Sequence, residues 1–132
     1  MRRQDWQLRF AEFATARANT PFEWGKNDCC LFTVDCVYAM TGEDHGEAFR
    51  GRYSTALQAE RIVKEHGGVR QLATEAWGEP VSPLMASVGD VVVMETDGRE
   101  ALAICNGTSA IGAGRNGIAV LSMDAALAAW KI

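Results

Sequence analysis

The sequence predicts one α+β domain spanning residues 1–132, with helices first and a small antiparallel sheet after them. Apolar residues recur at helical spacing as far as Gly78, and beyond Pro83 they change to short strand-like runs. Asn-Gly pairs at residues 106–107 and 116–117 separate these later runs and are strong hairpin signals. Helices followed by strands is the order of an α+β domain and not of alternating βαβ units.

Four helices are predicted in the first part of the chain. The first covers about residues 4–18, the third begins at Ser54 or Thr55 and runs to Glu65, and the fourth covers residues 69–77. The second helix, from Cys29 to Met40, is apolar almost all round, which is typical of a helix in the middle of a domain. We therefore expect this second helix to be the most buried one.

The strands are predicted from short apolar runs bounded by turn residues. These runs are residues 91–94, 101–105, 110–111 and 118–121. After them, a last helix capped by Ser122 is predicted to carry Leu127 and Trp130 to the end of the chain.

Composition excludes several classes of protein. Apolar residues make up 48% and charged residues 23% of the chain, which is ordinary globular usage and argues against disorder. The net charge of −4 and the scattered basic residues argue against a nucleic-acid partner. No apolar run approaches the ~20 residues of a membrane span, and no signal-peptide core follows the charged N-terminus. We expect the protein to stay in the compartment where it is made.

The four cysteines, Cys29, Cys30, Cys36 and Cys105, do not follow a zinc or ferredoxin spacing. Without an export signal, free thiols are expected, with no disulfide, no metal ligand set and no cofactor. One alternative is a metal or iron–sulfur module in which Cys29, Cys36 and Cys105 share a centre with a ligand from a partner.

Cys29 is the candidate nucleophile. A cysteine in the first turn of a helix lies at the positive end of the helix dipole, which stabilises a thiolate. Cysteines in apolar helices are also commonly small core residues. Both interpretations stay open, and the chemistry of the residues alone favours the core residue by a modest margin.

Two motifs resemble the NlpC-type cell-wall peptidases, which are cysteine peptidases with a papain-like fold. They are Trp-Gly-x-x-Asp-Cys at residues 24–29 and Gly-Asp-Val-Val at residues 89–92. The whole chain is also similar to a small family encoded in phage and prophage tail gene clusters. The features shared with that family are Asp-Cys-Cys-Leu-Phe, Arg-Gly-Arg-Tyr at residues 50–53, Gly-Asp-Val-Val and a final Ala-Ala-Trp. The resemblance implies a papain-like fold in which the cysteine helix packs on a small antiparallel sheet.

The resemblance also implies a site. Cys29 takes the nucleophile position, but the position of the peptidases' histidine, at the start of the second strand, is occupied by Ala101. We therefore expect Ala101 to face the Cys29 sulfur. The only histidines are His45 and His66, and chain order places neither beside Cys29. A papain-type site needs a base within hydrogen-bond reach of sulfur, so the catalytic histidine is absent on this alignment.

Asp35 lies inside the apolar helix and is expected to pair with Arg50 or Arg52. Such a pair is more often architectural than catalytic. The alternative is that Arg50 and Arg52 bind a carboxylate ligand through the fork geometry of the guanidinium group.

Three functions follow from these observations. The first is a structural or assembly protein of a phage tail tip on an inactive peptidase scaffold, assembled with other tail proteins in the bacterial host cytoplasm and located in the virion tail. The second is an active peptidase that uses Cys29 on cell-wall peptidoglycan. The third is the metal module. The missing histidine favours the first function over an enzyme, although fold alone does not give function.

Overall fold

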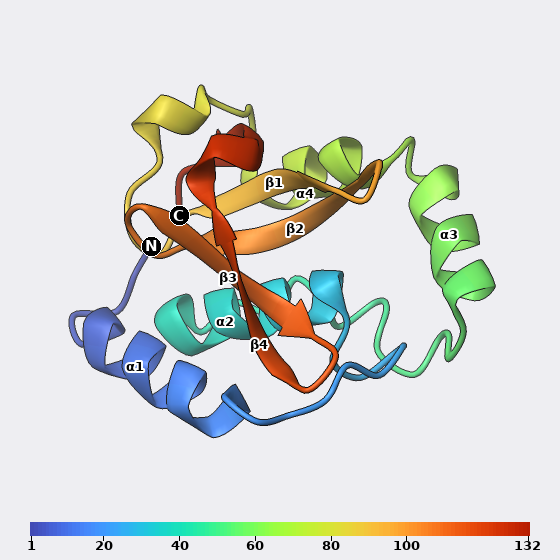
Figure 1. The fold of residues 1–132 in the computed structure, drawn as a ribbon, viewed down its shortest axis with the longest axis horizontal. Helices are drawn as coiled ribbons and strands as arrows, with labels where there is room; N and C mark the ends of the chain where they lie inside the picture. Colours follow the sequence, from blue (N-terminus) through green and yellow to red (C-terminus); the bar gives the residue numbers. More distant parts are fainter.

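A computed structural model describes residues 1–132 as an α+β fold, as the sequence predicted (Figure 1). The helices are α1 (Trp6–Arg17), α2 (Cys29–Thr41), α3 (Ala56–Glu65) and α4 (Val69–Trp77). The strands are β1 (Val91–Thr96), β2 (Arg99–Cys105), β3 (Ser109–Gly114), β4 (Gly117–Ser122) and β5 (Ala126–Trp130). They form one antiparallel sheet in the order β4-β3-β2-β1-β5. None of the helices has the length and apolar character needed to cross a bilayer.

Helix α2 is the central element of the fold, and the prediction that it is the most buried helix is confirmed. Seven of its residues are buried, whereas α1 and α4 each bury one and α3 buries none. The Asp28 side chain caps its first turn by accepting the Leu31 N–H at 2.9 Å. Gly42 ends it in the left-handed region, at φ 80°. Both boundaries therefore come from local sequence signals.

The sheet has a core on each face. The larger core lies between the sheet and the helices, where Phe32 and Val37 of α2 pack with Leu102 and Trp130. Helix α1 packs along α2 (Figure 1). The smaller core lies on the opposite face, where strand residues meet the connecting segments that precede β1 and follow β4; its buried members are Val92, Met94, Ala103, Cys105, Ala110 and Ala129.

The predicted C-terminal helix is wrong. Residues 123–125 make a single 3-10 turn, and β5 then pairs antiparallel with β1, with Val91 opposite Trp130 and Val92 opposite Ala129. Along β5, Ala128 and Trp130 belong to the larger core and Ala129 to the smaller one. Burial on both faces overrides the helix propensity of the alanines, because the strand covers the otherwise open edge of β1.

Helix α3 is set apart from the rest of the fold (Figure 1). None of its residues is buried, and it contacts mainly α4. Its apolar residues Ala59, Ile62 and Val63 line a groove instead of filling a core. The helix therefore forms one wall of the candidate site described next.

Candidate functional site

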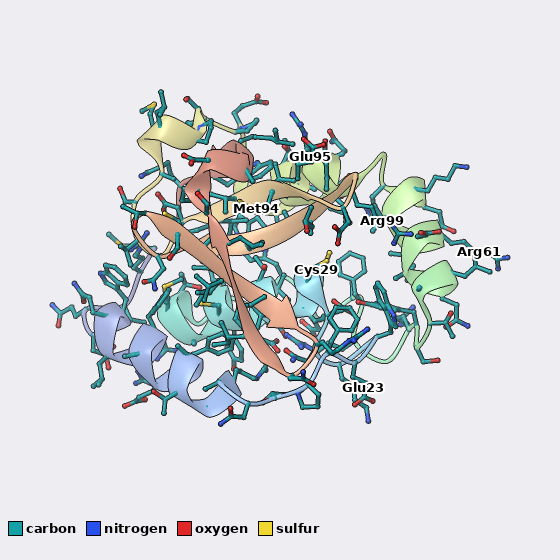
Figure 2. The ribbon with its side chains drawn as sticks, in the orientation of Figure 1. Glu23, Cys29, Arg61, Met94, Glu95 and Arg99 are labelled. Atoms are coloured by element: carbon teal, nitrogen blue, oxygen red, sulfur yellow. The ribbon has the colours of Figure 1, made fainter.

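A large groove runs between the start of α2, the helices α3 and α4, and the β1–β2 hairpin. Its volume is about 1120 Å³, and 19 of its 30 lining residues are hydrophobic, so the groove is mainly apolar. Cys29 and Cys30, the first two residues of α2, both line it. Figure 2 shows the Cys29 side chain projecting from α2 in the direction of the hairpin that carries Arg99. A ligand of considerable size could therefore reach the Cys29 thiol through the groove.

Asp28 fixes the chain around the start of α2. Its buried carboxylate accepts the backbone N–H groups of Leu31 and Gly25, each at 2.9 Å, and the hydroxyl of Tyr53. Burial, followed by the hydrogen bond to Asp28, raises the pKa of Tyr53, so the hydroxyl stays protonated and donates. The Asp of the Asp-Cys motif therefore has an architectural role, because it joins the loop before α2 to the long loop after it.

Gly25 allows the loop before α2 to approach the Tyr53 loop closely. Its φ is 82°, and a Cβ at this position would lie 2.1 Å from the carbonyl oxygen of Tyr53. Only glycine combines this backbone conformation with such a close approach. The glycine of the Trp-Gly pair is thus explained by its close packing against the Tyr53 loop.

The nearest polar neighbour of the Cys29 sulfur is the Cys30 thiol, which lies 4.0 Å away, sulfur to sulfur, and accepts from the Cys29 thiol. The backbone N–H groups of Leu102 and Cys30 also favour the ionised form of Cys29. The hydrogen bond from Cys30 is the main cause that lowers the pKa of Cys29; desolvation and the Asp28 charge oppose it. Donation to Cys29, together with burial, raises the pKa of Cys30. Cys29 is therefore the thiol that ionises first.

The register of β2 explains why the Leu102 amide is free to meet the sulfur. Cys105 exchanges backbone hydrogen bonds with Asp90 and Gly89 on the β1 side. In an antiparallel pair these bonds alternate, so the Leu102 amide points to the opposite edge of β2. Strand β3 pairs with β2 only from Ile104 onward. The first half of β2 thus leaves an open edge beside the N-terminus of α2.

The expectation that Ala101 faces the Cys29 sulfur is wrong. Ala101 lies opposite Met94, which belongs to the core on the face away from α2, whereas Leu102 belongs to the core on the α2 face. The Ala101 side chain therefore points away from the helix, although the residue borders the groove. The alignment that placed Ala101 at the histidine position therefore fails, because a slip of a single residue is enough to reverse the face of every side chain in a strand.

Glu100 is one candidate for a general base near Cys29. Glu100 lies on the α2 face and lines the groove, but both its oxygens accept hydrogen bonds from Arg70, at 2.9 and 3.0 Å. These bonds lower the pKa of Glu100, which makes it a poor proton acceptor.

Neither histidine hydrogen-bonds the Cys29 sulfur. His45 lines the groove, where its ring packs edge-on against Trp77 with 5.5 Å between centroids and lies 3.7 Å from Glu43. His66 pairs with Glu75 at 2.9 Å. No histidine or carboxylate side chain therefore hydrogen-bonds the Cys29 sulfur in this structure.

The predicted pairing of Asp35 with Arg50 is confirmed. The two residues form an ion pair at 2.5 Å, and Arg50 also bonds Asp44 at 2.9 Å. Asp35 has a second partner that the sequence did not reveal, Arg17 in the last turn of α1, also at 2.5 Å. Arg52 is exposed and no ion pair joins it. The guanidinium of Arg50 is thus engaged in holding the long loop to α2, and Arg17 joins the same Asp35 carboxylate to α1.

The structure does not bring Cys29, Cys36 and Cys105 together. Cys36 is buried in the core between α2 and the sheet, and Cys105 is buried on the opposite face. Burial is the main cause that raises the pKa of Cys36 to about 12. All four cysteines are free thiols, and no three His, Cys, Asp or Glu side chains are grouped as metal ligands. The proposed three-cysteine metal centre is therefore wrong.

Fold and site together define an α+β protein with a cysteine at the N-terminus of its central helix, opening on an apolar groove. The whole chain, residues 1–132, matches the family described as "Domain of unknown function (DUF6950)", and the protein belongs to that family. A comparison with curated proteins finds no match.

Alkylation should report the pKa of Cys29. In wild type, the rate constant for iodoacetamide at Cys29 should rise with pH through a midpoint below the ordinary thiol value of 9.0. Replacing Cys30 by alanine removes the main cause of the shift, so the midpoint should move upward. Peptide mass spectrometry assigns the rates, with buried Cys36 as the slow internal control. A wild-type midpoint at or above 9.0, or one unchanged in Cys30→Ala, would contradict this account of the site.

Proposed function

We propose that this protein is a non-hydrolytic member of the papain-like, NlpC-type fold and acts as a structural or assembly component of a phage tail tip. The order of elements supports the fold assignment: helices first, a cysteine at the start of the central helix, then a small antiparallel sheet. The assignment to a tail, with other tail proteins as partners and the virion tail as location, rests on the sequence resemblance to the tail-cluster family.

The observation that carries the proposal is the set of groups around the Cys29 sulfur. In a papain-type reaction an imidazole takes the thiol proton and later gives a proton to the leaving amine. Here the Cys29 thiol hydrogen-bonds the Cys30 sulfur at 4.0 Å, and the Cys30 thiol and the backbone amides of Leu102 and Cys30 lower the Cys29 pKa. They stabilise a thiolate, but none is a general base. Cys30, whose pKa is raised, is also a weak acid for a leaving amine.

One observation favours a second candidate, an active peptidoglycan peptidase with Cys29 as nucleophile. The pKa of Cys29 is lowered, and the sulfur opens on a groove large enough for a peptide. Nucleophilic attack by a thiolate needs no base at that moment. This candidate differs from the first in one measurable property, the hydrolysis of stem peptides.

The location of the protein tests its role in a tail. Intact particles should be purified from the phage that encodes this chain and examined by quantitative mass spectrometry and by cryo-electron microscopy of the tail tip. We expect the protein in every particle, at a fixed ratio to the other tail proteins, and deletion of its gene should yield incomplete tails. Its absence from both intact and partly assembled tails would contradict the proposal.

A further inference from the structure

We propose that Cys29 and Cys30 together form a two-sulfur site, open to the groove, that binds one thiophilic metalloid or soft metal ion. The two thiols are consecutive in the first turn of α2, they are half-buried, and both line the groove. The other two cysteines are fully buried in separate cores. The inference depends on neither the hydrolytic nor the tail assignment made above.

The spacing of the sulfurs fits one bridging atom. They lie 4.0 Å apart. An atom bound to both sulfurs at ~2.3 Å would form an S–X–S angle of about 120°, close to trigonal coordination. The angle of about 100° at pyramidal trivalent arsenic needs the sulfurs about 3.5 Å apart at the same bond length of ~2.3 Å, an approach of only about 0.5 Å. Both sulfurs can therefore bind one such atom with little movement from their present positions.

A direct disulfide fits the same pair less well. An S–S bond of ~2.05 Å would require the sulfurs to approach by about 2 Å. Consecutive side chains diverge around a helix, so closing that gap would distort the first turn. The turn is held by the Asp28 carboxylate on the Leu31 N–H. The geometry thus favours a bridging ligand over oxidation to a disulfide.

The neighbouring groups restrict the ligand to a soft one. The Asp28 carboxylate is occupied by three donors, and Tyr53 is held protonated on it. Hard cations need several oxygen ligands, which this site does not offer, whereas two thiolates suit soft ions and trivalent arsenic. The remaining coordination positions face the groove, where a bound organic group finds apolar walls.

A monosubstituted trivalent arsenical is the cleanest probe of this geometry. Each thiol gives up one proton, two arsenic–sulfur bonds form, and the arsenic-bound oxygen leaves as water, with no change in oxidation state. Folded wild type should be titrated with phenylarsine oxide and analysed by intact and peptide mass spectrometry. We expect one adduct per chain, located at Cys29 and Cys30, that withstands excess 2-mercaptoethanol and is removed by dithiothreitol.

The controls separate chelation from single-thiol binding. Cys29→Ser and Cys30→Ser should each bind the arsenical about 100-fold more weakly, because the second sulfur no longer acts at high effective concentration. Cys36→Ala, which removes a buried thiol outside the site, should bind as wild type does. Circular dichroism checks that each variant is folded. Wild type alkylated at Cys29 with one equivalent of N-ethylmaleimide provides a further control, because it lacks one of the two thiols without any substitution and should also bind the arsenical weakly.

Three results would overturn the proposal. The first is that folded wild type forms no adduct, and the second is that Cys30→Ser binds the arsenical as tightly as wild type does. The third is that diamide oxidises Cys29 and Cys30 to a disulfide more readily than the arsenical reacts with them.

Discussion

Replacing Trp130 by alanine is expected to lower the free energy of unfolding by about 3–5 kcal/mol, the usual cost of deleting a buried aromatic side chain. Trp130 is fully buried in the core between the sheet and the helices, opposite Val91 of β1. Its indole N–H also donates to the Thr74 hydroxyl of α4 at 3.3 Å. The substitution thus removes packing and the link between β5 and α4. Urea denaturation followed by circular dichroism measures the effect.

Leu127→Ala is the matched control for Trp130→Ala. Leu127 lies in the same strand but is 37% exposed, so its truncation should cost less than about 1 kcal/mol. Equal costs for the two variants would contradict the placement of β5 between the two cores and would reopen the helical interpretation of the C-terminus.

Asp90→Ala is expected to cost about 3 kcal/mol or more, because it leaves donors without their buried partner. Asp90 is fully buried and pairs with Arg2 at 2.9 Å and Lys131 at 2.5 Å, which brings both ends of the chain to the start of β1. Its carboxylate also accepts the backbone N–H groups of Ser87 and Ile132. The Asp of the Gly-Asp-Val-Val motif is therefore expected to stabilise the fold rather than act in chemistry.

Asp124→Ala provides the comparison for Asp90, since Asp124 is an exposed carboxylate with no ion pair. Its removal should change the free energy of unfolding by less than about 0.5 kcal/mol. If chemical denaturation gave Asp90→Ala the same small effect, the ion pairs of Asp90 with Arg2 and Lys131 would contribute little to stability.

The parts of the fold that follow from local signals were predicted well. Helix α2 combines a nearly continuous apolar sequence with the Asp28 cap and the Gly42 stop, and each of these acts within a few residues. The hairpin turns after β2 and β3 likewise follow from the Asn-Gly pairs. Such features need no knowledge of distant segments.

The C-terminal strand was missed because its cause is not local. Ala-Leu-Ala-Ala-Trp has good helix formers and weak alternation. It becomes β5 because β1 is buried on both faces and has an edge that accepts a partner. Nothing in residues 126–130 alone indicates that edge.

The site was predicted in the same uneven way. The position of Cys29 followed from its motif and from the start of the helix. The face of Ala101 depended on a strand register that the sequence fixes only through the alternation of Leu102 and Ile104, and the Ala-rich run makes that alternation weak. The Leu102 amide and the Arg17 partner of Asp35 arise from tertiary packing. No sequence motif carries either of them.

The hydrolysis of peptidoglycan stem peptides decides whether this protein is non-hydrolytic. Purified wild type and Cys29→Ser should be incubated with purified bacterial peptidoglycan, and newly released amino groups should be quantified over several hours. Since a positioned base contributes about 10²–10⁴ in rate, the account predicts that wild type releases no more than Cys29→Ser. Release by wild type that is lost in Cys29→Ser would contradict it and would establish Cys29 as the nucleophile of an active peptidase.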